Sequence, residues 1–160
     1  MRPVLGSLVF LVVVPGTMAG LIPWWLTGWD GQPVPFAQRG SGGLLIVTGL
    51  AVLLEAFARF ALEGRGTPAP VAPTERLVVG GMYRHVRNPM YVAVLAVILG
   101  QALLLGSARL AWYALGFWAL TASFVRFYEE PVLGRRYGAQ YDRYRVNVRG
   151  WWPRLRPWRG

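Results

Sequence analysis

Residues 80–105 read GGMYRHVRNPMYVAVLAVILGQALLL, a basic and aromatic turn that runs without a break into an uncharged apolar stretch. Gly80 and Gly81 predict a turn, and Pro89 suits the first turn of a helix. The apolar stretch, 89–108, is close to the ~20 residues that a helix needs to cross a bilayer. Arginines beside such a helix are typical of the bilayer surface, so the sequence predicts a polar site there.

Three further stretches have a similar length and composition, at residues 4–26, 41–62 and 110–128. With 54% apolar residues in 160, the chain has more hydrophobic surface than so small a globule can bury. We therefore predict an all-α integral membrane protein with four transmembrane helices and a C-terminal amphipathic interfacial helix. It forms one membrane domain: the first two helices in 1–62, a core in 63–153 with helices three and four, and a basic tail in 154–160.

The N-terminus allows a second interpretation, because Arg2 and the apolar run after it resemble a signal peptide with a weak cleavage site at residues 17–19. The run continues to Trp25, however, which is the length of a full span and ends in aromatic residues. We predict an uncleaved first helix that is kinked near Pro15 and Gly16.

All 17 basic residues are arginine, and the net charge is +10. One arginine precedes the first helix, four lie between helices two and three, and eight follow helix four, whereas the other side has only Arg39 and Arg109. The positive-inside rule then places both termini in the cytoplasm, in what we expect to be a bacterial inner (plasma) membrane. Arginines that flank spans favour anionic lipid headgroups over nucleic acid as partners. Without cysteine, the chain has no disulfide and no thiolate metal ligand, and we predict no metal site.

The connections predict which helix ends meet. Residues 63–74 are rich in glycine and proline and predict an extended spacer, after which Leu77 to Val79 form a short apolar segment against the bundle. Residues 106–109 are too few for anything but an antiparallel hairpin between helices three and four. We therefore expect two groups of residues to face one cytoplasmic pocket: Arg87, Asn88 and Tyr91, and Arg126, Glu129 and Glu130.

After Pro131, apolar and aromatic residues recur at helical spacing, at Leu133, Tyr137, Tyr141, Tyr144 and Val148. This spacing predicts an amphipathic helix at the headgroup level, with a plausible break at Gly138. Tryptophans 151, 152 and 158 predict a tail held at the membrane interface.

The sequence does not decide the roles of two polar features. Glu55 and Arg59 lie four apart on the second helix, either as a local ion pair or as groups that face the site. His85 fits an interfacial residue beside Tyr83 better than a catalytic base.

The ordered set of motifs in residues 64–153 resembles the isoprenylcysteine carboxyl methyltransferase and phospholipid methyltransferase superfamily. The motifs are Leu77-Val78, Gly81-Met82-Tyr83, Arg87-Asn88-Pro89-Met90-Tyr91, Glu129-Glu130, Leu133, Tyr137-Gly138, Tyr141, Tyr144 and Val148. The resemblance does not extend to the first two helices. It implies a membrane methyltransferase that uses S-adenosylmethionine. The cofactor contacts that it implies are Leu77, Val78, Tyr83, Asn88, Pro89, Met90, Tyr91, Glu129 and Glu130, with Arg126 as a substrate contact one position out of register.

Asn88 departs from the isoprenylcysteine enzymes, which have histidine there, and an asparagine cannot exchange a proton. The arginines favour an anionic, lipophilic acceptor such as a carboxylate that is reached from the bilayer, although two glutamates could also attract an amine. Two other functions are compatible with the sequence: a sterol-type reductase of related fold that uses NADPH, and a non-catalytic membrane scaffold. The sequence does not predict the oligomeric state.

Overall fold

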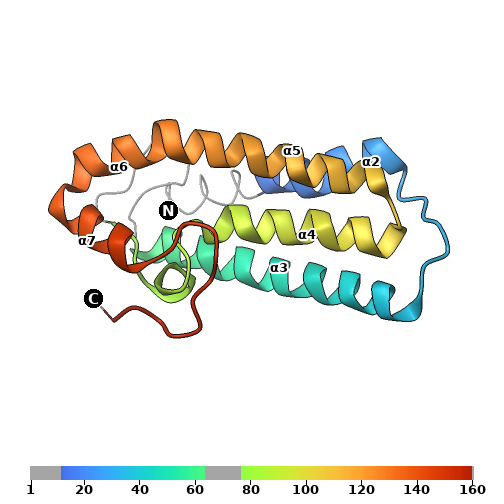
Figure 1. Cartoon of the computed structure of the whole chain (residues 1–160), viewed down its shortest axis with the longest axis horizontal. Coiled ribbons are helices and arrows are strands. Elements are labelled where there is room, and N and C mark those ends of the chain that lie inside the picture. The colour runs from blue at the N-terminus through green and yellow to red at the C-terminus, as the bar shows by residue number, and fades with distance from the viewer. Residues whose placement is uncertain (1–11, 64–76, 160) are drawn as a thin grey trace.

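The computed structural model describes residues 12–63 and 77–159, with 60–63 described by their backbone only, and all regular structure within them is helical. The expected all-α fold is confirmed for these residues. In Figure 1, three long helices lie side by side, with α4 between α3 and α5, and the C-terminal elements gather at one end. Their bounds are α3 Phe36–Glu63, α4 Pro89–Leu105 and α5 Ala108–Phe124.

The first apolar helix is described from Val12 to Thr27, and its expected beginning lies outside the described residues. It contains a π-helical segment, η1 (Thr17–Leu21), followed by α2 (Ile22–Thr27). The π-helical segment directly follows Pro15 and Gly16, where the sequence predicts a kink. The helix ends at Gly28, which has the left-handed φ of 61° that glycine adopts without strain.

The second helix begins at Phe36, five residues before the expected position 41. A glycine near its beginning allows close packing against α4. A Cβ at Gly42 would lie only 2.7 Å from the carbonyl oxygen of Gly100 on α4. Glycine here lets the two helix backbones approach, which outweighs its poor helix propensity.

Helices α4 and α5 form the expected antiparallel hairpin. Pro89 occupies the first turn of α4, and Gly106 ends that helix with a φ of 61°. Ser107 then caps α5, because its hydroxyl accepts a hydrogen bond from the backbone N–H of Leu110 at 3.4 Å. The core between the long helices consists of Leu53, Phe57, Ala93, Val94, Ile98, Ala114 and Phe117.

Two helical segments are long and apolar enough to cross a membrane, Phe36–Arg59 and Ala108–Tyr137. The other two apolar helices, Val12–Thr27 and Pro89–Leu105, are shorter. Large apolar side chains such as Leu44, Trp112 and Leu120 point outward from the bundle. These features fit a membrane protein, and four complete spans remain a prediction.

The C-terminal part differs from the expected single amphipathic helix. Helix α5 continues through a π-helical segment, η3 (Val125–Glu129), into α6 (Glu130–Tyr137). Pro131 lies in the first turn of α6 and does not interrupt this continuous helical path. The expected break at Gly138 is confirmed, with a φ of 50°, and α7 (Ala139–Asn147) follows.

The apolar face of α6 and α7 packs on the protein. Tyr141, Tyr144 and Val148 are buried in a cluster with Leu77 and Val79, so the segment before the turn lies against the bundle as expected. Residues 148–159, which we call the C-terminal strap, then run back beside the short 3₁₀ helix η2 (Gly81–Arg84), at the left of Figure 1.

Candidate functional site

The beginning of α4 and the end of η3 meet through Tyr91 and Glu129. The Tyr91 hydroxyl donates a hydrogen bond of 2.6 Å to Oε1 of Glu129. The bond joins residues 38 positions apart, and the hairpin is what brings them together. The juxtaposition that the sequence predicts for these two residues is therefore confirmed.

Glu129 has spare bonding capacity. Both Glu129 and Tyr91 are half-buried, and the hydrogen bond from Tyr91 uses only Oε1 of Glu129. A carboxylate oxygen readily accepts hydrogen bonds from hydroxyl or amino groups. Glu129 lies in the π-helical segment η3, a local widening of the helix that often accompanies functional sites.

Glu130 faces a different environment and is only 9% exposed. Its Oε1 lies 2.9 Å from Nη1 of Arg87, while its Oε2 lies 3.2 Å from Arg145 and 3.6 Å from Arg126. Three guanidinium groups thus share one carboxylate, and both of its oxygens are in ion pairs. Glu130 thus anchors these arginines, its Oε2 has no hydrogen-bond partner among the described residues, and its contact with a cofactor stays a prediction.

Arg87 ties the site to α7. Its Nη1 also donates to the Tyr141 hydroxyl at 3.0 Å. Burial raises the pKa of this phenol, and the charge of Arg87 offsets part of that rise. Tyr141 therefore accepts a hydrogen bond from Arg87 and also packs in the apolar cluster. The sequence pattern had indicated only its apolar face.

Tyr83 is part of the core. Only 7% exposed, it packs with Ala56, Val78 and Met90, and its carbonyl oxygen accepts a 2.7 Å hydrogen bond from the Tyr144 hydroxyl. Burial raises the pKa of the Tyr144 hydroxyl, which keeps this donor protonated. The predicted contacts other than Tyr91 and Glu129 thus lie mainly in packing positions, among them Leu77 in the α7 cluster and Pro89 in a fully buried position.

Asn88 holds the C-terminal strap. Its side-chain Nδ2 donates to the carbonyl oxygen of Gly150 at 3.1 Å, and its backbone N–H donates to the same oxygen at 3.3 Å. The backbone N–H of Arg87 donates to the carbonyl of Arg149 at 2.9 Å. The contact between Asn88 and the strap was not predicted, because no periodic pattern links the two segments.

The two polar features left open by the sequence have structural partners. His85 Nδ1 lies 2.8 Å from the carbonyl oxygen of Arg154, so this nitrogen carries the proton and donates. Glu55 pairs with Arg59 at 3.0 Å, and its second oxygen accepts the backbone N–H of Met82 at 3.2 Å. The local ion pair is confirmed, and it also holds the turn before α4.

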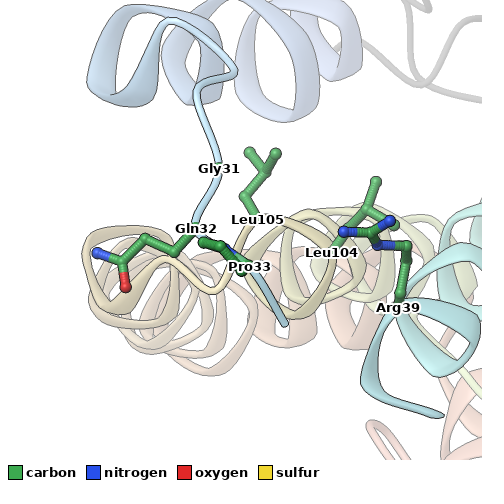
Figure 2. Close-up of a pocket in the computed structure, with 6 residues that line it drawn as sticks. All are labelled: Gly31, Gln32, Pro33, Arg39, Leu104 and Leu105. Atoms are coloured by element: carbon green, nitrogen blue, oxygen red, sulfur yellow. The ribbon is translucent and has the colours of Figure 1, made fainter. Parts of the chain in front are cut away.

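A pocket of about 500 Å³ lies at the opposite end of the bundle, near the connection between α4 and α5 (Figure 2). Among the described residues that line it, Arg39 alone is ionisable. It shares no residue with the Tyr91 and Glu129 pair and therefore does not belong to the candidate site. Its lining residues are Gly31, Gln32, Pro33, Arg39, Leu104 and Leu105.

Comparison with known families finds a match over much of the chain. A family model described as phospholipid methyltransferase matches residues 37–140, which is more than half of the chain. The match begins within α3, earlier than the motifs indicate, and ends at the beginning of α7. A search of curated proteins finds no match.

Proposed function

Because the chain belongs to the phospholipid methyltransferase family, we propose that it is an integral membrane enzyme that uses S-adenosylmethionine to methylate a lipophilic acceptor. The family is one of methyltransferases, and the resemblance in the motifs agrees with it. The observation that carries the proposal is the hydrogen bond between Tyr91 and Glu129, which leaves one carboxylate oxygen ready for a ligand.

The donor set fits S-adenosylmethionine. Oε2 of Glu129 can accept hydrogen bonds from ribose hydroxyls or from an amino group, and the half-buried ring of Tyr91 offers an apolar surface. When bound, the cofactor supplies an electrophilic methyl group on a positively charged sulfur. The role of the protein is then to align the reacting atoms and to exclude water, which requires no nucleophilic side chain.

The remaining predicted residues support this pair. Pro89 and Met90 fix the beginning of α4 on the bundle, and Tyr83 fills the core behind it. Asn88 ties the beginning of α4 to the C-terminal strap. We assign these residues to positioning, and we keep Tyr91 and Glu129 as the direct contacts.

The arginines around Glu130 favour an anionic acceptor. Arg126 and Arg145 are 65% and 43% exposed, and one buried carboxylate cannot neutralise them together with Arg87. Exposed guanidinium groups bind carboxylates or phosphates. A carboxylate acceptor, as in the isoprenylcysteine enzymes, would be nucleophilic without a base, and O-methylation follows from that choice.

The membrane placement is part of the proposal. We place four spans in a bacterial inner membrane with both termini in the cytoplasm, so that the site opens near anionic headgroups. A lipophilic acceptor would then reach the site from the bilayer.

Binding of S-adenosylhomocysteine to the purified protein in detergent tests the proposal. We expect saturable binding, with no binding of NADPH. Absence of binding at millimolar S-adenosylhomocysteine would overturn the proposed function, and tight binding of NADPH alone would favour a reductase. Binding of neither would leave the scaffold function.

A further inference from the structure

The C-terminal strap places Trp151 on the candidate site, beyond the segment that the family model matches. The Trp151 ring stacks on Tyr91 with the ring centroids 6.3 Å apart and an angle of 29° between the planes. It also contacts Trp118 of α5 edge to face, at 6.3 Å and 74°. Trp151 therefore bridges the beginning of α4 and the last turns of α5.

The position of Trp151 is fixed by its neighbours in the chain. The carbonyl oxygen of Gly150 accepts two hydrogen bonds from Asn88, and that of Arg149 accepts one from the backbone of Arg87. The backbone directly before Trp151 is thus held at the beginning of α4. The adjacent Trp152 is 74% exposed and makes no ring contact with a described residue, so only the first tryptophan of the pair belongs to the site.

Aromatic faces next to a carboxylate are suited to a positively charged ligand. The electron-rich face of tryptophan attracts a cation more strongly than that of tyrosine or phenylalanine, and the attraction grows when water is excluded. Tyr91 connects Trp151 to Glu129, because its ring contacts the indole while its hydroxyl bonds to the carboxylate. One residue, Tyr91, is therefore in contact with both the aromatic group and the carboxylate.

We propose that Trp151 is a cofactor-binding residue that presents its aromatic face to the sulfonium group of S-adenosylmethionine. This inference rests on the proposed function and adds a residue that the sequence motifs do not include. The proposal predicts that the contribution of Trp151 to binding depends on the charge of the ligand's sulfur. S-adenosylhomocysteine has the same adenosine and amino acid parts but a neutral sulfur, so Trp151 contributes more to the affinity for S-adenosylmethionine than to that for S-adenosylhomocysteine.

The experiment measures dissociation constants for both ligands, in detergent and without acceptor. The variants are Trp151→Leu, which keeps apolar volume without an aromatic face, Trp151→Phe, which keeps a weaker face, and Trp152→Leu as the matched control. We expect Trp151→Leu to lower the preference for S-adenosylmethionine by about two- to thirtyfold, because a cation–π contact has that strength. Trp151→Phe should fall between Trp151→Leu and the wild type, and Trp152→Leu should keep the wild-type preference.

The outcomes separate the two proposals. If the wild type binds neither ligand, the proposed function fails and the role of Trp151 fails with it. If the wild type binds both and Trp151→Leu weakens them equally, or leaves both unchanged, only the sulfonium contact is overturned. An equal change in preference for Trp151→Leu and Trp152→Leu would also overturn it. Thermal unfolding of each variant checks that it is folded.

Discussion

The hydroxyl of Tyr91 lies 2.6 Å from Oε1 of Glu129, and this hydrogen bond fixes a carboxylate of the last long helix against the first turn of α4. One oxygen of Glu129 is thereby oriented by the protein, while the other takes no part in this bond. A binding group that is already oriented loses less conformational entropy when the ligand arrives. The first two predictions therefore concern the effect of each member of this pair on cofactor binding.

We predict that Glu129→Ala weakens binding of S-adenosylhomocysteine by about 10- to 100-fold, the size expected when a charged hydrogen-bond acceptor is lost. Equilibrium binding in detergent measures the change. Asp142→Ala is the matched control, because Asp142 is an exposed carboxylate on α7. Similar losses in both variants would show that the ligand responds to overall charge and does not contact Glu129.

Tyr91→Phe should have a smaller effect on the same binding. The variant keeps the ring that packs against Trp151 and removes only the hydroxyl that orients Glu129. We expect a loss of affinity of about three- to tenfold, the value of one ordinary hydrogen bond. A loss as large as that of Glu129→Ala would mean that the hydroxyl contacts the ligand directly.

The ion pair between Arg87 and Glu130 leads to a prediction about stability. Removal of Arg87 leaves a buried carboxylate with only two exposed arginines as partners, so Arg87→Ala should lower the free energy of unfolding by about 3 kcal/mol. Thermal or denaturant unfolding in detergent measures this. Arg84→Ala changes an exposed arginine and should have little effect. In the double variant Arg87→Ala/Glu130→Ala the losses should be less than additive.

The hairpin explains why part of the site could be predicted from sequence. The two-residue connection, Gly106 and Ser107, forces α4 and α5 to be antiparallel, and this brings Tyr91 near Glu129. The apolar spacing likewise predicted the face shared by Tyr141 and Tyr144. Both inferences depend on local features of the sequence, namely the length of one connection and the spacing of apolar residues.

The contacts of the C-terminal strap could not be predicted in this way. The bonds from Asn88 to Gly150, and the contact of Trp151 with Tyr91, join irregular backbone to a helix end, and no period links them. The packing role of Gly42 could not be predicted for a related reason. It depends on how closely α4 approaches, which is a tertiary property.

Gly81→Ala should destabilise the turn before α4. Gly81 has a φ of 54°, which costs a residue with a side chain about 1 kcal/mol, and an added Cβ would collide with the Glu55 carboxylate. The Glu55 side chain can move away, so we expect a loss of about 1 to 2 kcal/mol in the free energy of unfolding, mainly from the left-handed backbone. Gly116→Ala is the control, because a Cβ there meets open space on α5. If Gly81→Ala were as stable as Gly116→Ala, the left-handed turn at Gly81 would not exist in solution.

The final prediction concerns the amide of Asn88. In Asn88→Asp, a carboxylate replaces the Nδ2 group and faces the carbonyl oxygen of Gly150, so two acceptors oppose each other without a proton between them. The strap should loosen at this point, although the backbone N–H of residue 88 still donates. We therefore expect trypsin to cleave the strap after Arg149 or Arg154 several-fold faster than in the wild type, as followed by mass spectrometry.

Two further variants give this experiment its specificity. Asn147→Asp removes an amide that donates to the carbonyl of Arg143 within its own helix, so cleavage of the strap should stay near the wild-type rate. Asn88→His restores a donor at position 88 and should slow cleavage relative to Asn88→Asp. If all three variants were cleaved at the same rate, Asn88 would not hold the strap. Trp151 would then lack the anchor that places it over Tyr91, because the strap reaches the beginning of α4 mainly through the bonds that precede it.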